Sequence, residues 1–327
     1  MTNNLYNKLH AEGLISDESF EKIRQKEAEP VLFSLHWEIK TLLYIGVLML
    51  TGGLGLLIYE NIDTIGHEFV LMLIAAICLG CFYYCFNNKR PFSKDRVQSP
   101  NSYFDYILLL ACTSLLIFVG YLQFEYKVFG THYGMATFIP MLALFFVAYC
   151  FDHLGILSMA IANLAVWMGV SVTPKQLLLE SDFNSETIIY TYLVLGIILI
   201  AAAYITQSTA FKKHFKFSYQ HYGIHVAYIA MLAGYFHYYD SGIAAVWMLG
   251  IFALSYFIYK DAFKEKSFYF LLLVVLYSYI AVSSLFVRMC IGIRDVAAFY
   301  IIALYFMGTA AYLIVLLINL NRKIKAS

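Results

Sequence analysis

The stretch FYFLLLVVLYSYIAVSSLF, residues 268–286, decides the fold class, because it contains no charged residue over a length that can cross a membrane. A membrane-spanning helix needs about 20 predominantly apolar residues. A strand of a transmembrane β-barrel would be about ten residues long and would alternate apolar with polar side chains. This run is continuous, as is LLYIGVLMLTGGLGLLIY at residues 42–59. Both stretches therefore predict membrane-spanning α-helices.

The composition of the whole chain agrees with this prediction. Of its 327 residues, 61% are hydrophobic, 18% are aromatic and only 13% are charged, whereas soluble domains carry about 25% charged residues. This hydrophobicity excludes an ordinary soluble domain and a disordered chain. The formal net charge of +1 leaves no basic domain with which to bind nucleic acid.

Ten apolar runs follow one another along the chain and predict an all-α, polytopic integral membrane bundle of about ten transmembrane helices. The expected spans are residues 41–59, 69–86, 104–122, 134–151, 154–173, 187–206, 222–238, 242–259, 267–287 and 296–319. The predicted domains are a short cytoplasmic amphipathic segment, residues 1–39, and a transmembrane domain, residues 40–327.

The positions of lysine and arginine set the expected orientation, because cytoplasmic loops are enriched in these residues. With the N-terminus in the cytoplasm, 18 of the 22 basic residues fall on the cytoplasmic side of the predicted spans. The exceptions are Lys127, Lys175, Arg288 and Arg294. The pattern predicts a multi-pass protein with both termini in the cytoplasm. The first span is expected to serve as an uncleaved targeting signal, since no signal-peptide pattern precedes it.

Residues 1–39 hold seven acidic residues and the pattern of one or two short helices. Gly13 is expected to end the first of these helices, and Ser16 is expected to cap the second. An acidic segment of this kind is a candidate docking site for a cytoplasmic protein partner.

The order of motifs in the first third of the chain resembles a known family. It comprises LHAEGLISDESFEKI at residues 9–23, SLHWEIK at residues 34–40 and the glycine-rich run LLYIGVLMLTGGLGLLIYENIDTIGH at residues 42–67. Over about residues 5–85 it is similar to the bacterial domain-of-unknown-function family numbered twenty-one fifty-seven, whose members are predicted polytopic membrane proteins. Where that family often has an Asn-Trp pair, this chain has Asn61-Ile62. The resemblance implies a bacterial inner-membrane protein and supplies no activity.

The predicted outer loop after the first span carries a group of polar residues. The group consists of Glu60, Asn61, Asp63, His67 and Glu68. Carboxylate and amide oxygens at this spacing are candidate ligands for a cation or another small ligand. The alternative is a solvated loop that keeps the helix ends in contact with water.

A second candidate ligand site lies between the last two predicted spans, where Arg288, Arg294 and Asp295 stand on the outer side. Two guanidinium groups can bind phosphate or carboxylate in bidentate fashion, so an anionic lipid headgroup or substrate is one hypothesis. The alternative is that the arginines extend to the headgroup layer or pair with Asp295, Glu60 or Glu68.

Two further sets of residues are candidates for a cavity or a proton relay. Asp152 and His153 are the charged interruption in the apolar stretch that contains the fourth and fifth spans. They predict either the caps of a tight helical hairpin or an acid–base pair. Asn163 and Trp167 lie one turn apart in the fifth span, where an asparagine either lines a cavity or hydrogen-bonds to another helix.

His221 and His225 are spaced to share one helix face, which fits either a metal site or an interfacial pair. Tyr277 and Tyr279 lie in mid-span and are expected to need hydrogen-bond partners wherever they are buried. No zinc signature, disulfide framework, nucleotide-binding loop or catalytic triad is present, so the sequence predicts no metal and no cofactor.

Three functions are compatible with this sequence. The first is a non-enzymatic membrane protein that transports or binds a small or lipid-like molecule in a cavity between helices. The second is a membrane anchor or regulatory subunit whose residues 1–39 dock a cytoplasmic partner. The third is an intramembrane enzyme that modifies lipids. Membrane lipids are expected partners in every case, and nucleic acid in none.

Overall fold

A computed structural model describes residues 10, 12–21, 66–130, 133–172, 185–292 and 296–326, together with six single residues between 42 and 60. The chain divides into two compact units, Met1–Val70 and Leu71–Ser327, which are described separately. The predicted first span and most of the expected outer loop after it lie outside the described residues.

In the first unit the local structure around residues 13–19 follows the prediction. Gly13 has a φ of +70°, the left-handed conformation with which helices commonly end, and its N–H donates to the carbonyl of His10. The side chain of Ser16 accepts a hydrogen bond from the backbone N–H of Ser19 at 3.3 Å. Both the predicted end of one helix and the predicted cap of the next are therefore confirmed.

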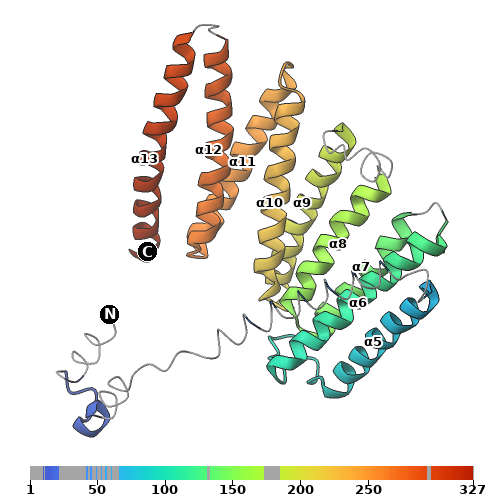
Figure 1. Cartoon of the computed structure of the whole chain (residues 1–327). Coiled ribbons are helices and arrows are strands. Elements are labelled where there is room, and N and C mark those ends of the chain that lie inside the picture. The colour runs from blue at the N-terminus through green and yellow to red at the C-terminus, as the bar shows by residue number, and fades with distance from the viewer. Residues whose placement is uncertain are drawn as a thin grey trace. The chain divides into compact units, whose positions relative to one another are not determined.

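The second unit is a bundle of long helices in which neighbours in the chain are also neighbours in space (Figure 1). The helices are α5 (His67–Asn88), α6 (Ser102–Tyr126), α7 (Tyr133–Phe151), α8 (Leu154–Val172), α9 (Glu186–Ser208), α10 (Phe215–His237), α11 (Ile243–Lys264), α12 (Phe268–Ile291) and α13 (Val296–Ala326). Among the described residues, all of these except α10, eight in total, are long and apolar enough to cross a membrane. The predicted all-α polytopic membrane bundle is confirmed.

Helix α10 reaches the same length as its neighbours, but it falls short of their hydropathy. It starts at Phe215, whereas the apolar run predicted a start at residue 222. The predicted start was late because the first turns of α10 are polar. These polar residues are buried against neighbouring helices, where Gln220 donates to Asp261 at 2.8 Å and Tyr219 bonds to Tyr149 at 3.0 Å. Polar side chains inside a membrane bundle are tolerated when other helices satisfy them. An average of hydropathy along the sequence cannot detect such partners on other helices.

Helices α9 and α10 form the centre of the bundle. One hydrophobic core joins parts of α5 to α10, a second joins parts of α9 to α13, and both include residues of α9 and α10. The two helices approach closely at Gly196 and Gly223. A Cβ atom on Gly196 would lie 2.7 Å from the backbone nitrogen of Ala227, and one on Gly223 would lie 2.8 Å from that of Ile200. Small residues allow this kind of close backbone approach in membrane proteins.

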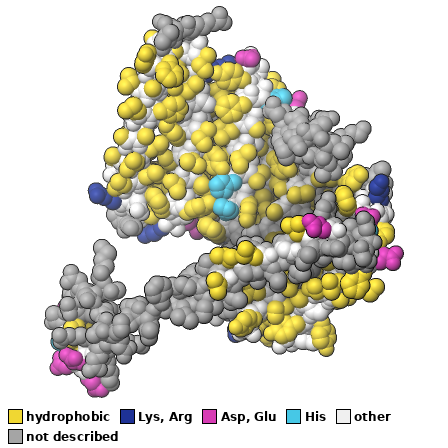
Figure 2. Space-filling model, in the orientation of Figure 1, with side chains coloured by type: hydrophobic (Ala, Val, Ile, Leu, Met, Phe, Trp, Pro, Cys, Tyr) yellow, Lys and Arg dark blue, Asp and Glu magenta, His cyan; other side chains and the backbone are white. Residues whose placement is uncertain are grey.

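The outer surface of the bundle is apolar. Leucine, isoleucine, phenylalanine and tyrosine side chains are exposed along the helices, and in the space-filling view they cover most of the visible face of α10 to α13 (Figure 2). Contiguous apolar surface on this scale is expected where a protein faces lipid.

Candidate functional site

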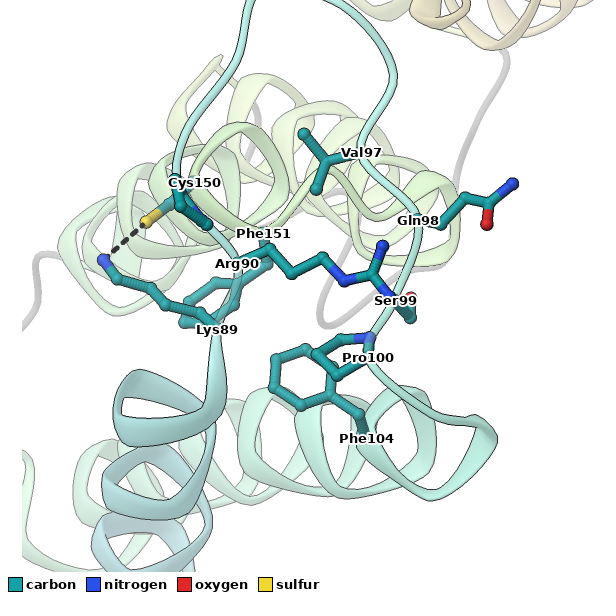
Figure 3. Close-up of a pocket in the computed structure, with 10 residues that line it drawn as sticks. Lys89, Arg90, Val97, Gln98, Ser99, Pro100, Phe104, Cys150 and Phe151 are labelled. Carbon is teal, nitrogen blue, oxygen red and sulfur yellow. Dashed lines mark hydrogen bonds between the residues drawn. The ribbon is translucent and has the colours of Figure 1, made fainter.

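A pocket lies at the end of the bundle where α5 is connected to α6. Its empty volume is about 270 Å³, including the space at its open mouth. The lining residues come from the connecting segment, from the start of α6 and from the end of α7 (Figure 3). They are Lys89, Arg90, Pro91, Val97, Gln98, Ser99, Pro100, Phe104, Cys150 and Phe151.

Two cations border this pocket directly after the end of α5. The ammonium of Lys89 lies 3.7 Å from Sγ of Cys150 and 5.0 Å from the ring centroid of Phe86. In Figure 3 the Arg90 side chain extends across the pocket towards Ser99. Within the part of the chain that the structure describes, neither cation makes an ion pair with a carboxylate. The pocket therefore combines two cations with the apolar walls supplied by Phe104 and Phe151.

A buried ion pair braces the walls of this pocket. Asp152 follows Phe151 in the turn between α7 and α8, and its carboxylate lies 3.2 Å from Nζ of Lys212, which comes from the connection between α9 and α10. The same carboxylate bonds to Nε2 of His214 and accepts the backbone N–H of Val97. Val97 belongs to one pocket wall and Phe151 to another, so Asp152 fixes both walls at once.

Lys212 is held on several sides in addition to its ion pair. Its backbone N–H donates to the carbonyl of Lys94 at 2.9 Å, and its ammonium lies 3.4 Å from the carbonyl oxygen of Asp95 and 5.0 Å from the ring centroid of Phe92. Three connecting segments, those after α5, α7 and α9, therefore meet at one end of the bundle. Their meeting agrees with the predicted alternation of loops between the two sides of the membrane.

The structure separates the roles of Asp152 and His153, which the sequence presented as a pair. Nδ1 of His153 accepts the backbone N–H of Ile156 at 3.2 Å, so this ring caps the start of α8. Its Nε2 lies 3.7 Å from Asp105. Burial lowers the pKa of His153, and the nearby Asp105 carboxylate opposes part of that shift. Asp152 has a φ of +60° and forms the buried ion pair.

A second polar site lies between α10 and α12 and contains the two histidines singled out in the sequence. Nδ1 of His221 is 2.6 Å from the hydroxyl of Tyr269, which is itself 3.2 Å from Nε2 of His225. Nδ1 of His225 is 2.7 Å from the hydroxyl of Tyr277. Histidine side chains interrupt the hydrophobic surface near these helices (Figure 2). The predicted need of Tyr277 for a partner is confirmed, and Tyr279 likewise bonds to Thr309 at 3.0 Å.

The structure shows the contacts of three further candidate residues. The guanidinium of Arg288 lies 4.1 Å from the ring centroid of Tyr239, which is a cation–π contact. Asn163 donates to the carbonyl of Thr137 at 2.9 Å, and the Trp167 ring packs 5.1 Å from that of Phe138. The asparagine therefore makes the interhelical bond that was one of its two predicted roles.

The predicted outer clusters remain predictions. Glu60 is an exposed helical residue, while His67 and Glu68 begin α5. Asn61, Asp63, Arg294 and Asp295 lie outside the described residues. A common site formed by these residues with Arg288 is therefore still a hypothesis.

Apart from Asp152, sequence reasoning did not single out the residues that build the pocket and its brace. Lys89, Arg90 and Lys212 entered only as part of the charge pattern, and His214 did not enter at all. The adjacent cations that directly follow an apolar run were a usable signal for the pocket. The partners of Asp152 gave no such signal in the sequence, because they lie about 60 residues away along the chain.

The pocket lies within the part of the chain that matches a known family. The family of predicted membrane proteins described as DUF2157 matches residues 7–157, which include every residue that lines the pocket. No curated protein and no solved structure matches the chain. The resemblance inferred from the first third of the sequence is therefore confirmed: residues 7–157 match the DUF2157 family of predicted membrane proteins.

Proposed function

We propose that this membrane protein binds the anionic head of a lipid-like molecule in the pocket formed by the α5–α6 connection, the start of α6 and the end of α7. The observation that carries the proposal is the pair of adjacent cations, Lys89 and Arg90, beside a cavity whose walls include Phe104 and Phe151. Ligand pockets typically combine apolar walls with a few charged groups that fix the orientation of the ligand.

The chemistry of the pocket suits a phosphate or carboxylate joined to an apolar group. An arginine offers a planar set of donors that fits either anion, and a lysine adds a compact positive charge. Apolar parts of the same molecule would contact Phe104 and Phe151 and extend into the adjoining lipid. A purely polar anion would leave these aromatic walls unused, which favours an amphipathic ligand.

The proposal includes an orientation. We place the pocket on the cytoplasmic side of a bacterial inner membrane, with both chain termini on that side, as the distribution of lysine and arginine predicts. Anionic lipids of the cytoplasmic leaflet would then lie next to the pocket mouth. Reporter fusions at the C-terminus and in the α12–α13 connection test the orientation, because they should report opposite sides of the membrane.

The binding test compares two double variants of equal charge. Lys89→Gln/Arg90→Gln removes the cations that line the pocket, whereas Lys94→Gln/Arg96→Gln removes two equally exposed cations of the same connecting segment that do not line it. Affinity for vesicles that contain phosphatidylglycerol is measured against vesicles of phosphatidylcholine alone. A charged hydrogen bond contributes about 1.5–3 kcal/mol, so the pocket variant should lose at least about tenfold in affinity for the anionic vesicles.

The control variant separates a site from general attraction to a charged surface. If both variants lose affinity equally, the binding is non-specific and the proposed function is wrong. Titration with inorganic phosphate and with glycerol phosphate distinguishes a lipid from a soluble ligand. Competition by either soluble anion at low concentration would indicate a small polar ligand and overturn the lipid-like assignment.

A further inference from the structure

The polar contacts between α10 and α12 form a continuous chain of donors and acceptors. The chain runs from His221 through the hydroxyl of Tyr269 to His225 and ends at the hydroxyl of Tyr277, with successive distances of 2.6, 3.2 and 2.7 Å. The hydroxyl of Tyr269 lies between a ring nitrogen of each histidine. Because a hydroxyl donates only one hydrogen, it donates to one histidine and accepts from the other. The hydrogen bonds at Tyr269 therefore point the same way along this series of side chains, and either direction is chemically allowed.

The surroundings of the two histidines are aromatic and small polar groups. The rings of Phe217 and Tyr222 contact His221, and the ring of Tyr228 stacks on Tyr277 with the centroids 4.5 Å apart. On the side of α11, the hydroxyl of Tyr228 bonds to Ser255, which in turn bonds to Ser278 of α12.

Charged groups near the start of α10 are engaged elsewhere. Lys216 pairs with Glu265 at 3.1 Å, and Asp261 accepts from Gln220. Within the described residues, no aspartate, glutamate, lysine or arginine bonds to His221 or His225. Among the residues that the structure describes, the titratable groups bonded to the two histidines are Tyr269 and Tyr277, so the hydrogen-bond chain consists of these four side chains.

The positions of these side chains along α10 and α12 give the hydrogen-bond chain a start and an end. His221 and Tyr269 lie in the early turns of α10 and α12, at the end of the bundle that carries the Lys216–Glu265 pair. His225 lies ten residues beyond Phe215, about 15 Å at a rise of 1.5 Å per residue. That distance is about half of the roughly 30 Å of hydrocarbon in a bilayer. Ionisable groups inside a membrane-spanning bundle commonly mark a proton or substrate path.

We propose that His221, Tyr269 and His225 form a proton relay that delivers a proton from this end of the bundle to His225. A proton from water binds Nε2 of His221, and the hydrogen on Nδ1 of that ring passes to the oxygen of Tyr269. The hydroxyl hydrogen of Tyr269 passes to Nε2 of His225. His221 and Tyr269 end neutral, and His225 carries the positive charge while its Nδ1–H donates to the oxygen of Tyr277. One proton leaves water, and one positive charge appears at His225.

The test measures the exchange of the ring N–H protons of His225 with water, by nitrogen-15 NMR of histidine-labelled protein in nanodiscs. The spectrum of His225→Gln identifies the signals of His225. Tyr269→Phe removes only the bridging hydroxyl and leaves the bond between His225 and Tyr277 in place. We expect exchange at His225 to slow by on the order of a hundredfold, as when a positioned proton donor is removed, while exchange at Nε2 of His221 is unchanged.

Tyr279→Phe is the matched control, because it deletes the hydroxyl of another tyrosine of α12 that bonds to a neighbouring helix. It should leave exchange at His225 unaltered. A merely structural Tyr269 would lower the thermal midpoint without slowing the exchange, and that result would overturn the relay. Should Tyr269→Phe fail to fold, His221→Gln removes the first member of the chain instead, and unchanged exchange at His225 in that variant would equally overturn the proposal.

Discussion

The carboxylate of Asp152 and the ammonium of Lys212 lie 3.2 Å apart, and both side chains are about 1% exposed. Each residue has a positive φ, 60° for Asp152 and 51° for Lys212. Such conformations persist in non-glycine residues when surrounding contacts hold them. The pair joins the turn after α7 to the connection after α9, so it links two segments that hydropathy alone would place independently.

Asp152→Asn should lower the free energy of unfolding by about 3–5 kcal/mol, because it leaves the buried Lys212 ammonium without its counter-ion. Unfolding of the detergent-solubilised protein, followed by circular dichroism, measures the loss. Asp95→Asn is the control, since the Asp95 side chain is exposed and only its carbonyl contacts Lys212. The double variant Asp152→Asn/Lys212→Met removes the orphaned charge and should recover part of the stability. Additive losses in the double variant would contradict the coupling.

Gly223→Ala should destabilise the bundle by about 1–3 kcal/mol, the usual cost of overpacking. The new methyl group would lie 2.8 Å from the backbone nitrogen of Ile200, which cannot move without displacing α9. Gly120→Ala is the matched control, because nothing lies within 4 Å of the corresponding position on α6. Thermal unfolding of both variants tests the prediction, and equal midpoints would show that α9 and α10 do not approach as closely as described.

The pair of Lys216 and Glu265 should make stability depend on acidity. The nearby ammonium of Lys216 is the main cause that lowers the pKa of Glu265 below its ordinary value of 4.5, and a hydrogen bond from Gln207 adds to it against the opposing effect of burial. A carboxylate with a lowered pKa stabilises the fold above its unfolded pKa and loses that contribution as the pH falls through the folded value.

We therefore expect wild-type protein to lose more stability than Glu265→Gln between pH 5 and 3, as measured by denaturation at a series of pH values. Glu265 is 37% exposed, so solvent screening keeps the difference below about 1 kcal/mol. Parallel curves for the two proteins would be evidence against a stabilising pair.

Cys150 provides a direct report on the pocket, because it lines the cavity and is partly exposed. A maleimide reagent should label Cys150 but leave Cys112, which is fully buried, unmodified. An anionic amphiphile bound beside Lys89 should slow the labelling of Cys150 severalfold. Peptide mapping by mass spectrometry reads both cysteines in the wild-type protein. Labelling at the same rate with and without amphiphile would place the binding elsewhere.

Local patterns of sequence were sufficient for the membrane helices and for several details of their ends. Continuous apolar runs predicted α12 within a few residues at each end, and Gly13 and Ser16 predicted a helix end and a cap. These features depend on neighbouring residues, so a short window contains all the information that they require. The position of Tyr277 within a predicted span was likewise sufficient to predict its need for a hydrogen-bond partner.

Tertiary structure alone decided which distant residues meet. It paired Asp152 with Lys212, joined His221 to His225 through Tyr269 and started α10 among polar residues that a hydropathy window rejects. The physical reason is that burial in lipid is a sum over local side chains, whereas an ion pair or a hydrogen-bond chain depends on how separate helices pack. The sequence by itself determined that this protein lies in a membrane as helices, and the packing of α5 to α13 determined where its few polar groups could act together.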